Sequence, residues 1–229
     1  MGISMASIPP PAGDSSAPPK IEASRPRRPK YLVVALVMAL LFGAGCWTEG
    51  CGTLAFYRGD TDVMAERNER IRDDQDRARV EALYQRYLDV ANAGRGRQIP
   101  FAAGIFVLGA ALLALGARGL AGKSNTRSAL MQVVAAQAIV VGASFFANKE
   151  IRWAQDDWRF EQVIVEQHEK LPPDQFELAL PKFRAMRRWL PPTWLTIRTF
   201  ASVLIIIALS RQRSREFFEA AGEPQPDQS

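Results

Sequence analysis

The sequence predicts an all-α, multi-pass membrane protein: four transmembrane helices, with two helical extramembrane loops that form a stalk or cap. Three observations support this fold class. The 229-residue chain is 48% hydrophobic, and this content is concentrated in four apolar segments, each near the length of about 20 residues that spans a bilayer. The intervening segments are strongly polar, and basic residues gather beside the apolar ones. We expect spans over residues 31–56, 99–118, 128–147 and 194–210.

Residues 1–30 precede the first span and are rich in Pro, Ser and Ala, without apolar periodicity. Such a composition predicts a disordered tail. The tail ends in the letters RPRRPK, whose four basic residues are expected to hold this end of the chain in the cytoplasm. The same letters contain a PxxP pattern, so recognition by a polyproline-binding domain is the alternative.

The two cysteines of the chain, Cys46 and Cys51, follow the apolar core of the first span. They are five residues apart and do not share a helix face, so a disulfide between them would require the helix to end near Gly45 or Gly50. The alternatives are a disulfide to another chain, free thiols, or acylation of Cys46. The letters AGC that end at Cys46 resemble a bacterial lipoprotein signal, although Gly43 stands where that signal carries Leu.

Residues 57–98 form a charged loop with nine Arg and nine Asp or Glu. Its second half repeats apolar residues at helical spacing, which is typical of an amphipathic helix. We expect this helix to run for about eight turns and to end at Gly94 and Gly96. Its apolar stripe needs a partner, and the second large loop offers one. The stripe consists of Val80, Leu83, Tyr84, Tyr87, Leu88 and Ala91.

The second and third spans form a helical hairpin around a short basic link, residues 119–127. Each of these spans repeats small residues every seven positions, and facing small residues let helices pack closely. Gly109 and Gly142 belong to these two stripes, and we predict that the stripes face each other. Gln137 is strongly polar and lies deep in the third span, so its amide is expected to find a partner across a helix interface. A place on a transport path is the alternative.

The hairpin link contains a pattern that resembles a phosphate-binding loop. The letters ARGLAGKS, residues 117–124, match that pattern except for the first glycine. A working phosphate-binding loop follows a buried strand, whereas this one follows a membrane helix, so we expect no nucleotide to bind. One His and two Cys are too few for a structural zinc site. The acidic residues around His168 scatter around a helix axis. We therefore expect no catalytic residue, no metal and no cofactor.

Residues 148–193 form the second large loop, with eight basic and eight acidic residues. No helix breaker precedes Leu171, so the third span is expected to continue outward as one helix. A second helix then returns to the membrane, kinked at Pro181, and places Trp189 where an interfacial aromatic belt would fall. Trp158 lies on the apolar stripe of the outgoing helix. The stripe consists of Ile151, Ala154, Trp158 and Val165.

The last span contains Arg198, one turn inside its start. Nine Leu, Ile, Phe or Val residues contribute roughly −3 to −5 kcal/mol to insertion, against a cost of about +2.5 to +3.5 kcal/mol for a central Arg. Membrane insertion of this span is therefore favoured. We expect Arg198 to lie near the headgroups, with an acid such as Glu49 as its partner. Residues 211–229 form a tail that is basic at first and then acidic and disordered.

Three short segments carry basic residues with little or no acid: the end of the N-terminal tail, the hairpin link and the start of the C-terminal tail. An even number of spans places all three on one side, which the positive-inside rule assigns to the cytoplasm. The two large loops then lie outside it. Size, simplicity and the lack of other targeting signals favour a bacterial inner membrane.

The loops are amphipathic and show no grouping of catalytic or metal-ligating residues, which favours a non-enzymatic structural or interaction protein. Its partners would be the lipid bilayer and another protein or a second copy of the chain, bound through the extracytoplasmic helices. The basic residues beside the spans have a topological explanation, so nucleic acid is not expected as a partner. A sensory or signalling input subunit is the alternative. A transporter or channel subunit is third, because only Gln137 and Arg198 offer polar groups within the spans.

Overall fold

The computed structural model describes residues 28–59, 71, 73–123 and 125–220, and every regular element there is a helix. This confirms the all-α fold class for the described part of the chain. Residues 1–27, the first part of the charged loop and the last nine residues, on which parts of the sequence predictions fall, lie outside it. The helices are α1 (Lys30–Arg58), α3 (Asp74–Ala93), α4 (Arg95–Leu120), α5 (Thr126–Ala147), α6 (Lys149–Lys170), α7 (Pro173–Ser210) and α8 (Gln212–Ala220).

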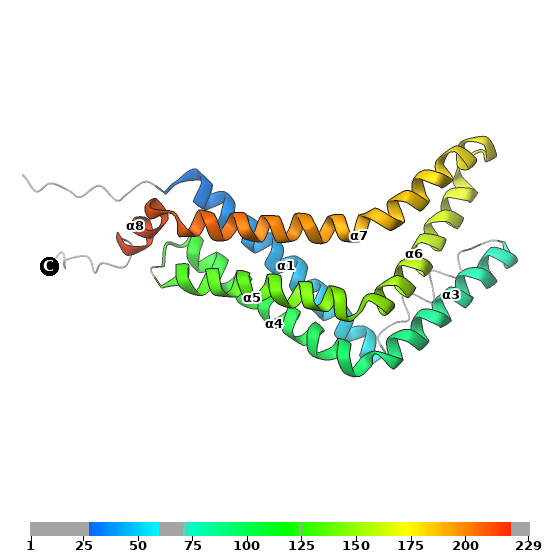
Figure 1. Cartoon of the computed structure of the whole chain (residues 1–229), viewed down its shortest axis with the longest axis horizontal. Helices are drawn as coiled ribbons and strands as arrows, with labels where there is room; N and C mark the ends of the chain where they lie inside the picture. Colours follow the sequence, from blue (N-terminus) through cyan, green and yellow to red (C-terminus); the bar gives the residue numbers. More distant parts are fainter. Residues whose placement is uncertain (1–27, 60–70, 72, 124, 221–229) are drawn as a thin grey trace, which may run out of the picture.

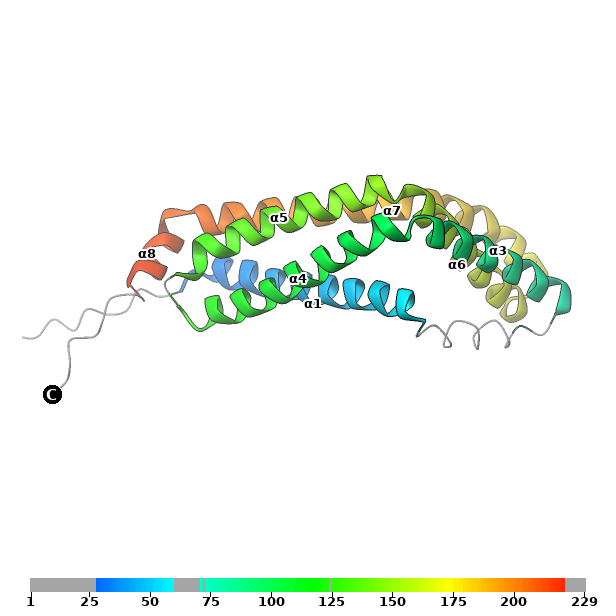
Figure 2. The same cartoon turned by 90° about the horizontal axis from the view of Figure 1, so that it is seen from below.

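Four of these helices, α1, α4, α5 and α7, are long and apolar enough to cross a membrane. Only 17–33% of each apolar window is buried inside the protein, so most of the apolar surface of these helices faces outward, as a lipid environment allows. Helix α1 packs on α4 and α7, and α5 also packs on α4 and α7. We call this four-helix unit the spanning bundle. In Figure 2, α5 and α7 form one layer of it and α1 and α4 the other.

The closest approach in the spanning bundle is between α1 and α4. A Cβ added at Gly109 would lie 2.5 Å from the backbone nitrogen of Trp47, and one added at Gly50 would lie 2.7 Å from that of Phe106. Glycine is therefore required where these two backbones meet. Toward one end of the bundle, Leu32, Leu36, Leu112, Leu130, Val134 and Leu209 form a buried cluster that joins all four helices.

The predicted pairing of small residues between the second and third spans is wrong. Gly109 lies against α1, and a Cβ added at Gly142 would meet nothing within 4 Å. Helix α4 packs on α5 through a looser contact, in which a Cβ added at Gly104 would lie 3.7 Å from Val140. A seven-residue repeat shows which face of a helix permits close packing, but several spans can use such a face, and α1 takes it here.

Beyond the spanning bundle, α3 and α6 pack together, and residues 173–192 of α7 pack on α6. We call these three segments the arm, which lies at the end opposite to α8 in Figure 1. The two apolar stripes predicted for the charged loops are buried against each other, which confirms that they are partners. The shared cluster contains Val80, Tyr84, Tyr87 and Ala91 of α3 and Ile151, Ala154, Trp158 and Val165 of α6.

Helix α3 has 20 residues and is therefore shorter than the eight turns that the sequence predicted, and it ends at the predicted Gly94. Its N-cap is Asp73, whose carboxylate accepts hydrogen bonds from the backbone N–H groups of Gln75 and Asp76 at 2.8 and 3.0 Å. This is a standard way to satisfy the free donors of a first turn. At the other end only Gly94 interrupts the chain before α4 begins at Arg95.

The sequence predicted that the third span would continue outward as one helix, and this prediction is wrong. Helix α5 ends at Ala147, and Asn148, with φ −105° and ψ 26°, separates it from α6. The side chain of Asn148 donates to Ser144 Oγ at 3.2 Å and accepts from Arg97 Nε at 3.3 Å. A Cβ at Gly94 would collide with the side chain of Ile151. The two interruptions therefore lie side by side, at the boundary between the spanning bundle and the arm.

The sequence predicted a returning loop helix and a separate last span, but the structure has a single helix, α7, in their place. Its 38 residues run without interruption through Pro181, Pro191 and Pro192, so the returning loop helix and the last span are one element. Proline removes a backbone donor and crowds the preceding turn, and α7 changes direction along its length in Figure 1. The Thr196 hydroxyl donates to the carbonyl oxygen of Pro192 at 2.9 Å.

The three basic segments meet at the end of the bundle away from the arm, which we call the basic end. Arg28 Nη2 donates to the carbonyl oxygen of Leu120, and Arg127 Nε donates to that of Leu209, each at 2.7 Å. Helix α8, which the sequence analysis did not predict, lies here and buries Phe218 in the bundle. Figure 1 shows α8, the start of α1 and the α4–α5 link together.

Candidate functional site

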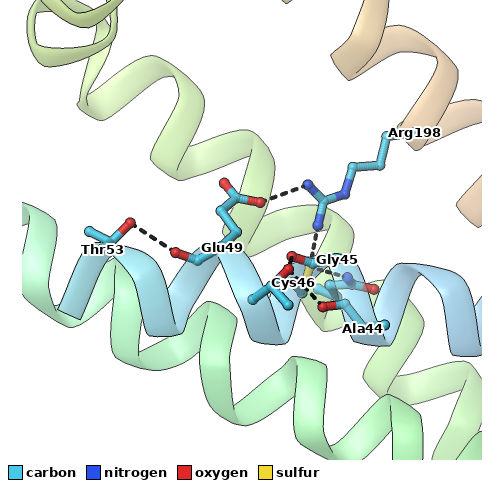
Figure 3. Close-up of polar contacts among 8 residues, drawn as sticks. Ala44, Gly45, Cys46, Glu49, Thr53 and Arg198 are labelled. Atoms are coloured by element: carbon cyan, nitrogen blue, oxygen red, sulfur yellow. Dashed lines mark hydrogen bonds and ion pairs between the residues drawn. The ribbon is translucent and has the colours of Figure 1, made fainter. Parts of the chain in front are cut away.

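A small polar cluster lies inside the spanning bundle and joins three of its helices. It consists of Cys46 and Glu49 on α1, Gln137 on α5 and Arg198 on α7. Figure 3 shows Arg198 directed toward Glu49 and Cys46. Cys46 and Glu49 share a face of α1 because they are three residues apart. Sequence reasoning named all four residues but missed that Cys46 is an acceptor shared by Gln137 and Arg198. The spacing between Cys46 and Glu49 was the one signal available.

Gln137 has its partner across a helix interface. Its Nε2 donates to Cys46 Sγ, and the side chain is only 2% exposed. Its Oε1 is buried and has no hydrogen-bond partner among the described residues. A polar group in an apolar environment stabilises contact with whichever helix can satisfy it. Gln137 therefore ties α5 to α1.

Arg198 forms the ion pair that the sequence predicted. Its Nη1 lies 3.2 Å from Glu49 Oε2, and its Nη2 donates to Cys46 Sγ. The Arg198 side chain is 13% exposed, whereas that of Glu49 is 53% exposed. The pair therefore lies at the edge of the bundle. A buried guanidinium needs several acceptors to offset its desolvation, and the two on α1 tie α7 to that helix.

A cavity of about 600 Å³ lies beside this cluster, where the spanning bundle meets the arm. Glu49 and Arg198 line one side of it, and Arg152 and Arg159 of α6 line another. Arg152 Nη1 donates to the carbonyl oxygen of Phe145, and its guanidinium carbon lies 3.4 Å from the centre of the Phe145 ring. Arg152 Nε is buried without a hydrogen-bond partner among the described residues.

Charged groups of α6 surround the arm side of this cavity. Burial raises the pKa of the Asp156 carboxyl, and the positive charges of Arg152, Arg159 and Arg187 oppose that shift. Burial lowers the pKa of Arg152, and Asp156 opposes it. Arg187 of α7 forms an ion pair with Asp157. This region therefore holds α6 and α7 together through charges that are partly withdrawn from water.

The geometry does not meet the condition for a disulfide between the two cysteines. Helix α1 passes through both without a break, and Cys46 is buried while Cys51 is exposed, so no disulfide joins them. A disulfide to another chain stays a prediction. Acylation of Cys46 stays a prediction. Cleavage before Cys46 would remove the part of α1 that contributes Leu32 and Leu36 to the buried cluster of the bundle.

The two tryptophans named from the sequence have different surroundings. Trp158 is buried in the arm, stacked on Tyr87 with ring centres 5.8 Å apart and tilted against Tyr84 at 5.0 Å. Trp189 is 64% exposed on α7, with the guanidinium of Arg188 6.0 Å from its ring centre. Trp158 is thus a packing residue, while Trp189 presents a large apolar surface that the described residues leave uncovered.

What the polar cluster can do is mechanical and electrostatic: it joins three helices and presents the Arg198 side chain to the cavity. Within the described residues, no group of three or more His, Cys, Asp or Glu side chains is placed to hold a metal ion. Neither a protein-family model, nor a curated protein, nor a solved structure matches this chain.

Proposed function

We propose that this chain is a non-enzymatic integral membrane protein that acts as a structural or interaction component through its arm. The observation that carries the proposal is the outward face of α7 in the arm. Leu178 is 74% exposed, Met186 50% and Trp189 64%. Large apolar side chains grouped on one helix are typical of a surface that another molecule covers.

The partner that fits this face is a second protein or another copy of the chain. Helix α6 supports α7 from behind through the ion pair of Asp157 with Arg187, and the aromatic cluster in turn holds α6 on α3. The face is therefore presented on a braced helix, which lowers the ordering cost of binding.

Site-specific photocrosslinking in native membranes tests this proposal. A crosslinking amino acid at Met186 or Trp189 is expected to give a defined protein adduct, either to a second copy or to one other protein. The matched control is the same amino acid at Arg86, which is exposed on α3. Adducts to lipid alone, or equal yields from Arg86, would overturn the proposal.

The same proposal includes an orientation with both termini in the cytoplasm of a bacterium, so that the arm lies outside its inner membrane. The gathering of arginines at the basic end supports it, because basic residues beside spans favour the cytoplasmic side. Reporter fusions test it. A fusion after Gly122 should be active as a cytoplasmic reporter, and one after Gln75 as an external reporter. The reverse pattern would reverse the orientation.

A second candidate function, a sensory input subunit, is favoured by the boundary between the bundle and the arm. Gly94, Asn148 and the Pro191–Pro192 pair interrupt or bend three helices there, with the polar cluster nearby. Such a boundary permits the arm to tilt as a unit. Spin-label distances between Arg86 and Gly122 should then show two populations in lipid nanodiscs. A single narrow distance would count against this function.

A further inference from the structure

We infer that the cavity between the spanning bundle and the arm binds the headgroup of an anionic phospholipid from the adjacent leaflet. This inference stands apart from the proposed protein partner, because it uses a different face of the molecule. It depends on the position of the cavity, its charge, an unsatisfied donor and the apolar part of its lining.

The cavity lies at the depth where a lipid headgroup would be found. It is lined by the last turns of α5, the first turns of α6, and α7 from Pro191 to Arg198. Trp194 lines it and is 60% exposed, so the cavity reaches the outer surface of the bundle. Tryptophan is enriched at the membrane–water interface, which places the mouth of the cavity at headgroup level.

The lining is positively charged. Three arginines, Arg152, Arg159 and Arg198, face a single acid, Glu49, and that acid is already paired with Arg198. Among the described residues, neither Arg152 nor Arg159 forms an ion pair within 4 Å, although Asp156 lies close enough to act on the charge of both. With Asp156 included, the local charge is still +1. An anion is therefore the favoured occupant.

Arg152 also offers a donor that the described residues leave unused. Its Nη1 donates to the carbonyl oxygen of Phe145, but its buried Nε has no partner among them. A buried unsatisfied N–H costs free energy, and a guanidinium binds the oxygens of a phosphate through its fork of donors. Because the protein closes off Nε, a phosphate that binds Arg152 would turn the guanidinium so that this donor faces the cavity, and the turn would satisfy it.

The rest of the lining is apolar and favours a lipid over a free anion. Ile105, Val141 and Leu195 line the cavity from three different spanning helices, where acyl chains would pass. A volume of about 600 Å³ falls within the range of small-molecule sites, which is about 300–1,000 Å³. It can hold a headgroup with the first part of its chains. The chemistry is thus that of a phosphate attached to a hydrocarbon.

The test uses the full-length protein in detergent, with binding measured by native mass spectrometry and by the shift of the thermal unfolding midpoint. The probes are phosphatidylglycerol, phosphatidylcholine and soluble glycerol phosphate. We expect phosphatidylglycerol to bind and raise the midpoint, phosphatidylcholine to bind more weakly, and glycerol phosphate to have no effect. Equal binding of the two lipids would overturn the anionic part of the inference. Glycerol phosphate binding as tightly as the lipid would overturn the lipid part.

Two variants locate the site. Arg159→Gln removes a charged side chain that forms no hydrogen bond or ion pair among the residues that the structure describes, so the fold should be retained. Arg152→Gln removes the unsatisfied donor. Each is expected to weaken phosphatidylglycerol binding by about tenfold, the loss typical of one charge-assisted hydrogen bond. The matched control is Arg86→Gln on the exposed side of α3, which should bind as the wild type does. Unchanged binding in folded Arg159→Gln, or an equal loss in the control, would overturn the inference.

Discussion

Two helix–helix interfaces of this protein, one in the spanning bundle and one in the arm, are built in opposite ways. Helices α1 and α4 meet backbone to backbone at Gly50 and Gly109, while α3 and α6 meet through aromatic rings, with Trp158 stacked on Tyr87 and tilted against Tyr84. Lipid is as apolar as a leucine side chain, so burial alone does not bring spans together, and close approach must do so. The arm helices carry exposed charges such as Asp74 and Arg79, as helices in water do, and in water the burial of large aromatic groups is the stronger force. The α1–α4 interface therefore depends on close backbone approach, and the α3–α6 interface depends on aromatic burial.

The largest effect is expected from Trp158→Ala, which removes the aromatic packing between α3 and α6. It should unfold the arm and leave the spanning bundle intact. Removal of a buried aromatic side chain costs about 3–5 kcal/mol. The measurement is amide hydrogen exchange in nanodiscs, with protection lost in α3 and α6 and kept in α1 and α4. Trp153→Ala, five residues away and exposed, is the control and should keep protection in both regions.

The converse change is Gly109→Ala, which should loosen the spanning bundle and leave the arm intact. Its Cβ would meet backbone atoms of α1, which cannot rotate away, so we expect a loss near the upper end of the range of about 1–3 kcal/mol for overpacking. Gly142→Ala adds the same methyl group to open space. Unfolding in a denaturing detergent should separate the two variants, and equal stability would refute the close-packing account.

A pH titration sharpens the comparison because the arm has buried tyrosines at its centre. Burial raises the pKa of the Tyr87 phenol from 10.0 to about 12. The unfolded state loses its proton first, so stability is fully present below about pH 10 and is lost as the pH rises through 12, by roughly 2.7 kcal/mol for a two-unit shift. Tryptophan fluorescence during denaturation at stepped pH measures this. Tyr87→Phe should reduce the dependence.

The smallest effect should come from the ion pair on the surface of the arm. Arg79 Nε lies 3.0 Å from Glu161 Oε1, with side chains 65% and 13% exposed. Pairs of this kind contribute about 0.2–1 kcal/mol. Arg79→Gln should therefore lower the free energy of unfolding of the arm only slightly, and the difference should shrink at high salt. A loss comparable to that of Trp158→Ala would mean that charge, not aromatic packing, holds the arm.

The same contrast explains which parts of the fold were readable in the sequence. The stripes of the arm were predicted together with their pairing, because an amphipathic helix in water has one apolar face and must bury it. In the bundle, both the lipid-facing and the buried sides of a helix are apolar. The repeat that contains Gly109 therefore showed a close-packing face but not that α1 would occupy it.

Local breaks were the least predictable features. Asn148 ends α5 although no proline or glycine is present, because its side chain bonds to Ser144 and Arg97, and that bonding depends on the tertiary fold. Three prolines fail to end α7, because proline removes only some of the bonds of a long helix that packs along both regions. At the polar cluster, the pairing of Arg198 with Glu49 could be predicted from their opposite charges. The role of Cys46 as a hydrogen-bond acceptor could not, because its thiol carries no charge.

The arginines of the basic end have a consequence for any attempt to re-engineer the protein. Arg28 and Arg127 hold the carbonyl oxygens of Leu120 and Leu209, at points where α4 and α7 have run out of internal donors. Topology is often inverted experimentally by moving cationic residues from one flank of a hydrophobic stretch to the other. Here that manipulation would also fray two helix termini, so insertion direction and end stability cannot be altered independently.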